Sequence, residues 1–448
     1  MRLGPGIDGC VARLKRHHWA FRRLHEIFIK RLTAEPAYEL KMGFSLHAHY
    51  CAEHAAAWRK RVAEMREPPL GLDAVPDAAL DAFFDQILNA PEIESLLLGV
   101  YGHALPALRD ALQQHFDTTN VLVDHPSRRI CRFALIEVDE MIDFGNRAIA
   151  ALVDDRARSA FAPQKAALDR LLAQAGGLDG TAEVAGGEIV RHNPPRPYDS
   201  RPQRDERFPD PYNMGVHAEK FLYDPSMPED AKTLMMFYKR LREIDVPEMM
   251  ASIIAETTGK PWAYKVDMTR QLWDEARHAM MGEVGFVSLG IDWRMVPVNF
   301  TWSQSLNSQL GPLERHAVLY FIEQGLMPRS GKRHEWEVGR ASGHPLAALF
   351  QDFDWADEVL HAHIGRTWYV SAMPGPREAV EFGDACWSKV MMNWSAWKRD
   401  GLTTHRNWWP DVYRAACTRA GRPVREDQAA YATSYENTRA DLKPLAAE

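Results

Sequence analysis

The pattern of apolar and polar residues divides the chain into two helical halves. Apolar residues recur at helical spacing from about residue 11 to residue 173, with few β-branched clusters and short polar breaks. We expect helices over residues 11–33, 37–66, 92–117 and 127–153, with Pro68, Pro69 and Pro76 in the longest connection. Four helices of this length can form a bundle of their own.

A break follows over residues 176–228, where glycine, proline, arginine and aspartate are frequent. Its Gly-Gly and Pro-Pro pairs prevent one continuous helix, so this stretch is the natural connection between two domains. We therefore predict an N-terminal helical bundle domain over residues 1–175, followed by the connection at 176–228.

Helical periodicity resumes after the connection and runs in four segments. We expect helices over residues 229–257, 261–288, 304–327 and 345–371, with a polar loop at 328–343. The sequence Gly259-Lys260-Pro261 combines a helix-stop and a helix-start signal, so the first two helices should be antiparallel neighbours. Residues 229–371 should form a second four-helix bundle. The all-α chain ends in a tryptophan-rich helical extension, residues 372–448, which should pack against this bundle.

The amino-acid composition of the chain mainly excludes some classes of binding partner. The chain has 448 residues, enough for two domains, with 46% hydrophobic residues, 26% charged residues and a net charge of −7. This acidic balance argues against a protein whose main task is to hold nucleic acid or an anionic membrane. Residues 13–31 are a basic exception, which we interpret as a solvated helix face.

The five cysteines lie far apart and form no C-x-x-C pair. This usage is typical of reduced thiols in a cytoplasmic protein rather than of a disulfide framework. The first residues lack an apolar signal core, and no apolar run is long enough to span a bilayer. We expect a cytoplasmic protein without a membrane partner, whose oligomeric state stays open.

Two Glu-x-x-His tetrapeptides, Glu275 to His278 and Glu358 to His361, are the main chemical signal. Residues at i and i+3 share one helix face, so each pair can direct a carboxylate and an imidazole at one metal ion. Roughly one such tetrapeptide is expected by chance in a chain of this length. However, Asp-Glu-x-x-His-Ala-x-x-Gly occurs at residues 274–282 and again at 357–365. This repeat indicates a duplicated helix pair and a pseudo-symmetric site for two metal ions.

A site for two ions also needs a carboxylate from each of the other two helices. Glu243 precedes Gly259 by as many residues as Glu275 follows it, so these two glutamates should be level in an antiparallel hairpin. Glu323 stands in a similar relation to Glu358 across the longer loop.

Pro247 leaves one alternative open for the first helix, because it lacks the amide that would bond to the Glu243 carbonyl. Either the helix kinks beside Glu243, or a new helix begins at Pro247 and Glu248 becomes the better candidate.

The predicted metal ligands are Glu243, Glu275, His278, Glu323, Glu358 and His361. Four carboxylates balance two divalent cations, and this oxygen and nitrogen set suits iron or manganese. We expect two iron ions, with an iron and manganese pair as the alternative, and the four glutamates as the catalytic residues. Without metal, four converging carboxylates would repel one another and their pKa values would rise.

Asp274 and Asp357 each precede a ligand glutamate and should face a neighbouring helix rather than the metal ions. Each can accept the outer N–H of the opposite histidine, Asp274 from His361 and Asp357 from His278. Arg277 lies one turn after Asp274 and can hold its carboxylate. The alternative is two exposed acidic residues in surface ion pairs.

The run Asp274-Glu275-Ala276-Arg277-His278 resembles the D-E-x-R-H signature of the ferritin-like di-iron carboxylate proteins. These include ribonucleotide reductase small subunits, acyl-carrier-protein desaturases and bacterial multicomponent monooxygenases. More closely, residues 243–369 resemble an uncharacterised bacterial ferritin-like family related to the tRNA hydroxylase MiaE, with similarity at 297–299, 323–326 and 357–368. The resemblance implies a ferritin-like bundle whose dimetal centre activates O2, but it supplies no substrate. The second motif departs from the signature, since Leu360 stands where the first has Arg277.

We therefore predict an O2-dependent dimetal oxidase or monooxygenase, a non-haem di-iron oxidoreductase. It would act on a small or carrier-bound substrate and draw on an external electron donor. One alternative is a metal-binding accessory protein of the same fold without catalysis. A second alternative is RNA hydroxylation, which requires a basic surface near the site and which the overall acidity disfavours.

Other polar residues are lesser candidates. His47, Cys51 and His54 share a helix face in the N-terminal half, and we interpret them as core residues rather than a second metal or haem site. His316 shares a helix face with Glu323, and is either a buried neutral histidine or a further ligand or substrate contact.

Overall fold

The computed structural model describes residues 3–434 except 67–70, 214, 329–330 and 392–393. The described chain is all-helical, as predicted, and one antiparallel β-bridge joins Val216 to Ser434. None of the described helices has both the length and the apolar character needed to cross a membrane. The chain divides into two compact units. Unit 1 comprises Met1–Arg31, Gly43–Asp199 and Pro261–Val266, and unit 2 comprises Leu32–Met42, Ser200–Lys260 and Asp267–Glu448.

The residues expected to connect the two domains are shared between these units. Residues 176–199 belong to unit 1, where the Gln86 side chain accepts the backbone N–H groups of His192 and Asn193 at 2.6 and 2.7 Å. Residues 200–228 belong to unit 2 together with the short segment Leu32–Met42. Hydrogen bonds to Gln86, which a composition pattern does not reveal, thus tie the first part of the predicted connection to unit 1.

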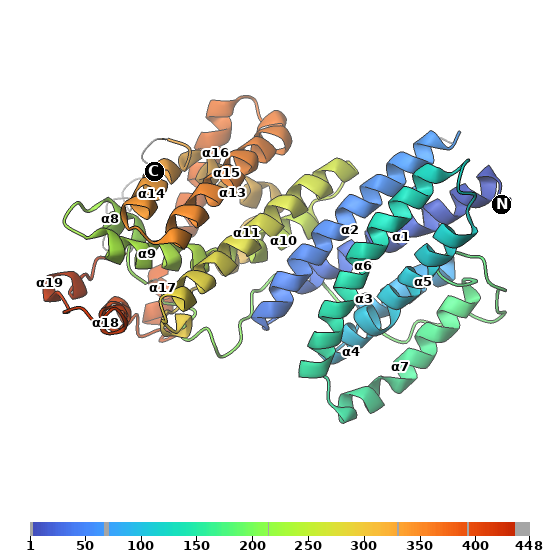
Figure 1. The fold of residues 1–448 in the computed structure, drawn as a ribbon, viewed down its shortest axis with the longest axis horizontal. Helices are drawn as coiled ribbons and strands as arrows, with labels where there is room; N and C mark the ends of the chain where they lie inside the picture. Colours follow the sequence, from blue (N-terminus) through green and yellow to red (C-terminus); the bar gives the residue numbers. More distant parts are fainter. Residues whose placement is uncertain (1–2, 67–70, 214, 329–330, 392–393, 435–448) are drawn as a thin grey trace. The chain divides into compact units, whose positions relative to one another are not determined.

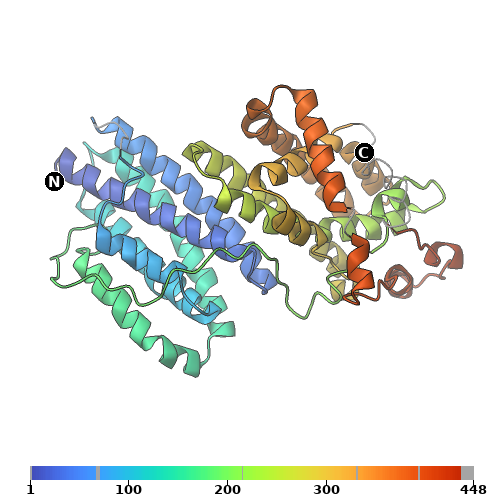
Figure 2. The same ribbon diagram turned by 180° about the vertical axis from the view of Figure 1, so that it is seen from behind.

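Unit 1 consists of long amphipathic helices and contains every helix predicted for the first half (Figures 1 and 2). Its helices are α1 (Ile7–Leu32), α2 (Tyr38–Glu64), α3 (Ala78–Leu88), α4 (Ile93–Gly99), α5 (Leu105–Thr118), α6 (His125–Leu152) and α7 (Asp155–Gln174), except that the last residue of α1 and the first five of α2 belong to unit 2. The shorter α3 and the polar α7 were not expected. A π-helical turn, η1 (Val100–Ala104), separates α4 from α5 within the helix predicted at 92–117. Pro106 lies just after it and cannot donate to a carbonyl of the preceding turn, which favours such a bulge.

Unit 2 contains the second set of predicted helices and the C-terminal extension. Its helices are α8 (Ala218–Tyr223), α9 (Glu229–Arg242), α10 (Asp245–Glu256), α11 (Trp262–Ser288), α12 (Thr301–Gln309), α13 (Pro312–Gly325), α14 (Lys332–Ala341), α15 (Pro345–Trp368), α16 (Pro376–Met391), α17 (Trp394–Arg399), α18 (Trp409–Arg419) and α19 (Glu426–Ala429). Short 3₁₀ turns, η2 (Trp293–Met295) and η3 (Val370–Ala372), follow α11 and α15. In α11, the first residues up to Val266 belong to unit 1.

The helix predicted at 229–257 is interrupted beside Glu243. Helix α9 ends at Arg242 and α10 begins at Asp245. Because Pro247 has no N–H, the Glu243 carbonyl accepts from Val246 instead, at 3.0 Å, in a tighter turn. The structure matches neither alternative fully: the helix breaks at Glu243 and Ile244, and the new helix begins at Asp245, two residues before Pro247.

Two further predictions for this half were wrong in detail. The helix predicted at 304–327 is two helices, because Gly311 and Pro312 start α13 anew. The predicted polar loop at 328–343 contains α14, whose buried face holds Lys332, Glu335 and Val338 and packs against α9 and α15. The sequence of α14 is highly charged and was therefore expected to be a polar loop. Two of its charged residues are in fact buried.

Two glycines of the repeated nine-residue motif set how closely the helices approach. A Cβ atom at Gly282 of α11 would lie 2.2 Å from the backbone nitrogen of Leu241 in α9. At Gly365 of α15, a Cβ atom would lie 2.4 Å from the Tyr320 ring of α13. The glycine of the repeated motif therefore allows close helix packing, while the glutamate and histidine of the motif are the candidate ligands.

The C-terminal extension belongs to the same core. Trp408, Trp409 and Tyr413 are buried with Phe237 and Tyr238 of α9, and the Tyr238 and Trp408 rings lie 4.4 Å apart. Helix α16 packs along α13. The tryptophan-rich extension thus packs against the helices that bear the predicted ligands, as the sequence predicted.

Candidate metal centre

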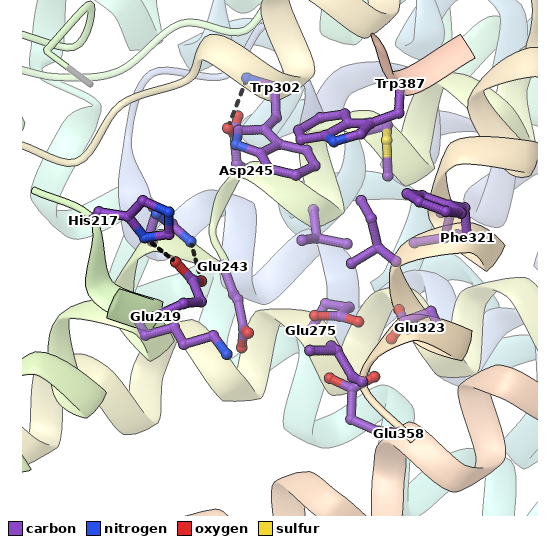
Figure 3. Close-up of a pocket in the computed structure, with 18 residues that line it drawn as sticks. His217, Glu219, Glu243, Asp245, Glu275, Trp302, Phe321, Glu323, Glu358 and Trp387 are labelled. Atoms are coloured by element: carbon purple, nitrogen blue, oxygen red, sulfur yellow. Dashed lines mark hydrogen bonds and ion pairs between the residues drawn. The ribbon is translucent and has the colours of Figure 1, made fainter. Parts of the chain in front are cut away.

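The six predicted ligands converge in the interior of unit 2. Glu243 follows the last residue of α9, α11 supplies Glu275 and His278, α13 supplies Glu323, and α15 supplies Glu358 and His361. All are buried except Glu243, whose side chain is 15% exposed. Figure 3 shows the carboxylates of Glu243, Glu275, Glu323 and Glu358 around the floor of one cavity.

One half of the cluster is centred on His361. Its Nδ1 atom lies 3.2 Å from Glu275 Oε1, 3.4 Å from Glu358 Oε2 and 3.8 Å from Glu323 Oε1. These four residues each offer a ligand atom within 4.8 Å of the others, close enough to surround one ion. Gln271 holds Glu323 in place by donating to its Oε1 at 3.0 Å.

The other half is centred on His278. Its Nδ1 atom lies 3.5 Å from Glu243 Oε2, from Glu275 Oε2 and from Asp354 Oδ1. Glu243, Glu275 and His278 form a second group that could hold an ion. Glu275 belongs to both halves and directs one oxygen at each histidine, which is the position of a bridging carboxylate.

The outer nitrogen of each histidine faces an aspartate on the opposite helix. His278 Nε2 lies 3.2 Å from Asp357 Oδ2, and His361 Nε2 lies 3.4 Å from Asp274 Oδ2. Arg277 donates to Asp274 and, at 2.8 Å, to Asp357. The cross-pairing expected from the sequence is present. It fixes the ring orientation, so both Nδ1 atoms point at the carboxylates.

The chemistry of the donor atoms fits divalent metal ions, and several of these atoms lack a hydrogen-bond partner. His278 Nδ1, His361 Nδ1, Glu243 Oε2 and Glu358 Oε2 are buried without a hydrogen bond to the described part of the chain. Orphaned buried polar atoms are costly and rare in folded proteins. Here they converge from both halves of the cluster, and imidazole nitrogen with carboxylate oxygen is the ligand set of iron and manganese.

The pKa values of the glutamates differ from the expectation, drawn from the sequence, that all four would rise. Burial raises the pKa of Glu323 well above its ordinary value, and the nearby Glu358 and Glu275 carboxylates add to the rise. Burial also favours a higher pKa at Glu275, but His278 and His361 outweigh it and lower that pKa to about 2. The same burial opposes charge on His361, yet Asp274 and Glu275 raise its pKa well above the ordinary value. The raised pKa values favour a proton on His361 and on Glu323, and metal ions bound to these groups would displace such protons.

Three charged residues at the centre were not predicted from the sequence. Asp354 lies one turn before Glu358 and is fully buried. Lys332 Nζ lies 2.8 Å from Glu358 Oε1 and 2.9 Å from Asp354 Oδ1. Arg240 contacts Asp354 and lies 2.7 Å from Glu243 Oε1. Asp354 and Arg240 share helix faces with predicted ligands and could have been noticed, whereas Lys332 fell in a segment expected to be a loop.

Glu248, the alternative to Glu243, has a different role. It is fully buried and forms ion pairs with Lys41 at 3.0 Å and with Arg204 at 3.0 Å. Ser303 also donates to it at 2.8 Å. Glu248 therefore neutralises buried cations away from the centre, and Glu243 is the carboxylate that faces His278.

A cavity of about 330 Å³ opens directly onto the carboxylates (Figure 3). Beyond the carboxylate floor, one part is lined by Trp302, Trp387 and Phe321 with aliphatic neighbours, and another by the polar residues His217, Glu219, Lys239 and Arg242. The two indole rings are stacked with their centroids 3.7 Å apart.

The lesser candidates remain outside this centre. His316 is buried beside Tyr369, and burial lowers its pKa to about 4, as for a neutral core histidine. In unit 1, His47 Nδ1 lies 2.7 Å from the Tyr101 hydroxyl and His54 lies 2.6 Å from Glu137. Neither histidine belongs to a possible metal-binding group among the described residues.

Cys10, His115 and Asp124 form one further group that could hold a metal ion in unit 1. However, Asp124 is already paired with Arg61 at 2.7 Å and caps α6 by accepting from Ser127. Burial raises the pKa of Cys10 to about 11, so its thiol stays protonated. We interpret this trio as part of the helix packing.

No family model matches the chain, and neither the curated proteins nor the solved structures contain a significant match to it.

Proposed function

We propose that unit 2 is a ferritin-like dimetal oxidoreductase that uses O2 to oxidise or hydroxylate a small organic molecule. The observation that carries this proposal is Glu275, which directs one carboxylate oxygen at His361 and the other at His278. With Glu243, Glu323 and Glu358 at the same cavity floor, this arrangement suits two adjacent metal ions. The repeated motif and the resemblance of residues 243–369 to ferritin-like proteins support the same conclusion.

The residues of the chain have distinct parts in this proposal. Glu275, Glu323, Glu358 and His361 would hold one ion, and Glu243, Glu275 and His278 the other. A bound pair of iron ions would supply the electrons that reduce O2. Asp274, Asp357 and Arg277 hold the imidazoles in the orientation that presents Nδ1 to the ions. The aromatic lining would keep water away from the reacting substrate.

The cavity favours catalysis over a non-catalytic accessory role. A protein that only stores or carries metal does not need a cavity beside its ligands with tryptophan and phenylalanine in its lining. A volume of about 330 Å³ is at the low end of small-molecule sites, so the substrate, or the reacting end of a carrier-bound one, is small. An external donor would return electrons to the centre. We place the protein in the cytoplasm, because all five cysteines are free and buried.

Reconstitution with iron tests this function. Metal-free protein would be loaded with Fe(II) under argon and then mixed with oxygenated buffer, and O2 consumption followed with an electrode. We expect about one O2 consumed per pair of ferrous ions, much faster than by free Fe(II), and little by the Glu275→Ala variant. Two bound ions without O2 consumption would instead support the accessory role. Absence of bound iron would contradict the proposal altogether.

A further inference from the structure

The cavity beside the carboxylates has two chemically different ends (Figure 3). At one end, Trp302, Trp387 and Phe321 are joined by aliphatic side chains, among them Met249 and Ile322. The aromatic end is therefore a dry, polarisable surface suited to a ring system or another apolar body.

The polar end presents more hydrogen-bond donors than acceptors. Lys239 is paired with Glu335, and His217 and Arg242 with Glu219, but the lysine and the arginine carry more N–H groups than these pairs use. The Glu219 carboxylate lies 3.2 Å from His217 Nδ1 and 3.4 Å from Arg242 Nη2. A bound molecule would therefore place an acceptor, such as a carbonyl oxygen, at this end.

Volume limits the size of the occupant. A cavity of about 150 Å³ is enough to bind benzene, and this cavity has about 330 Å³. We propose that it binds a mainly apolar molecule of one or two rings with a hydrogen-bond acceptor at one end. This names the substrate class of the proposed oxidoreductase and rests on that function for turnover, but binding itself needs no metal.

Calorimetry on chelator-treated, full-length protein with two matched neutral probes tests the proposal. We expect 2-acetylnaphthalene to bind at least fivefold more tightly than 2-ethylnaphthalene, which has the same shape without the acceptor. Arg242→Met should abolish this preference while leaving the affinity for 2-ethylnaphthalene unchanged. Equal affinity of wild-type protein for both probes would overturn the acceptor assignment.

A variant that narrows the cavity tests whether the probe binds there. Gly325 lines the cavity, and a Cβ atom there would meet no atom within 4 Å, so Gly325→Phe should fold and fill part of the space. We expect at least tenfold weaker binding of both probes. Trp336→Ala, which removes an indole outside the cavity, should not change binding. Unchanged binding in Gly325→Phe would overturn the proposal, while failure of O2 consumption with intact probe binding would overturn only the oxidoreductase function.

A separate observation concerns the metal centre itself. Lys332 is fully buried, and its ammonium group lies 2.8 Å from Glu358 Oε1 and within 3.0 Å of both Asp354 oxygens. Glu358 therefore gives one oxygen to this cation and only the other to the His361 side. Asp354, which also faces His278, is held by Lys332 and Arg240.

The two halves consequently differ in charge. The His361 side has Glu275 and Glu323 in addition to one oxygen of Glu358. On the His278 side, Glu243 is paired with Arg240 at 2.7 Å, so less negative charge faces an ion there. We infer that the centre binds its two metal ions unequally, first at His361 and more weakly at His278, and that Arg240, which holds both Glu243 and Asp354, sets the difference. This inference rests on the metal binding assumed in the proposed function.

Anaerobic equilibrium dialysis against Fe(II), followed by metal analysis, measures both affinities without any activity assay. A unit charge about 4 Å from an ion at an effective dielectric constant near 20 changes affinity by about 1,000-fold or more. We therefore expect the two dissociation constants of the wild-type protein to differ by about that factor. Arg240→Met should reduce the difference below about tenfold, and Arg240→Lys should preserve it.

Lys41→Met is the matched control, because Lys41 is also a fully buried cation paired with a glutamate, Glu248, in the same unit. It should leave the difference in affinity unchanged. Two equal sites in the wild-type protein, or the same difference in Arg240→Met, would overturn this inference alone. No iron binding by any variant would overturn the proposed function.

Discussion

His361 and Asp274 lie on different helices, yet Nε2 of the histidine is 3.4 Å from Oδ2 of the aspartate. The pseudo-equivalent pair, His278 and Asp357, is separated by 3.2 Å. The two pairs link α11 and α15 reciprocally, so each motif orients the histidine of the other. This reciprocity explains why the repeated motif begins with aspartate, a residue that does not itself face the cluster of ligands.

We expect Asp357→Asn to weaken metal binding at His278 by about 10- to 100-fold, because its amide no longer fixes the charge and orientation of the imidazole. Iron affinity by anaerobic dialysis is the measurement. The matched control is Asp352→Asn, which changes an exposed aspartate of the same helix. Equal iron affinities in Asp357→Asn and wild-type protein would show that the histidine does not need this partner.

Glu243→Gln and Glu248→Gln should have opposite effects. Glu243→Gln should impair binding of the second ion with little loss of stability, since its side chain is partly exposed. Glu248→Gln should keep the metal content but lower the free energy of unfolding by about 3–5 kcal/mol, because Lys41 and Arg204 lose their buried counter-charge. Metal analysis and urea unfolding of both variants separate these outcomes. Loss of metal in the Glu248 variant alone would reverse the assignment.

Gly282→Ala should destabilise unit 2, because the new methyl group meets the backbone of Leu241 rather than a movable side chain. We expect a loss of about 1–3 kcal/mol in the free energy of unfolding, despite the better helix propensity of alanine. Gly325→Ala, where a Cβ atom meets nothing within 4 Å, is the control and should be neutral or slightly stabilising. Chemical unfolding curves measure both. Similar stabilities would mean that α9 and α11 are less closely packed than described.

Acid should destabilise unit 1 because its interior holds several neutral histidines. Burial lowers the pKa of His47 to about 3, below its unfolded value. The unfolded chain therefore binds more protons than the folded chain at low pH, and stability is lost as pH falls below about 6.5. Each such histidine costs about 2 kcal/mol at pH 5. Similar burial lowers the pKa values of His17, His18, His25 and His115.

The variant His47→Gln isolates one of these contributions. It keeps a polar group beside the Tyr101 hydroxyl but cannot gain a proton. Its stability difference between pH 7 and pH 5 should be smaller than that of the wild type by about 2 kcal/mol. Hydrogen exchange in α2 at the two pH values measures the effect locally. An unchanged acid sensitivity would mean that His47 already binds a proton in the folded state.

The sequence predicted which carboxylates and histidines meet at the candidate centre because their geometry is local. A histidine three residues after a glutamate must share its helix face, and the Gly259 turn places Glu243 level with Glu275. The cross-pairing of Asp274 and His361 follows from the same helical geometry. The first two relations need only one helix or one hairpin, and the cross-pairing needs in addition only the repeat of the motif on two facing helices, so pattern and spacing contain them.

The charge network around the ligands depends on tertiary packing and was missed. Lys332 begins a short charged helix that resembles an exposed loop, and only the packing of α14 against α15 brings its ammonium group to Glu358. His217 and Glu219, at the polar end of the cavity, come from a segment expected to be a connection. Pro247 signalled a break in the helix, but the sequence could not show that Glu248 would pair with Lys41, a residue distant along the chain.

Metal content of the wild-type protein beside the Glu275→Ala variant tests the central claim most directly, because Glu275 is the residue that both halves share. Both proteins would be dialysed anaerobically against saturating Fe(II), and bound iron measured per chain. We predict about two ions in the wild type, in keeping with a bundle that holds a pair of ions, and loss of both in the variant. Wild-type protein without bound iron, or a Glu275→Ala variant that retains both ions, would contradict the account.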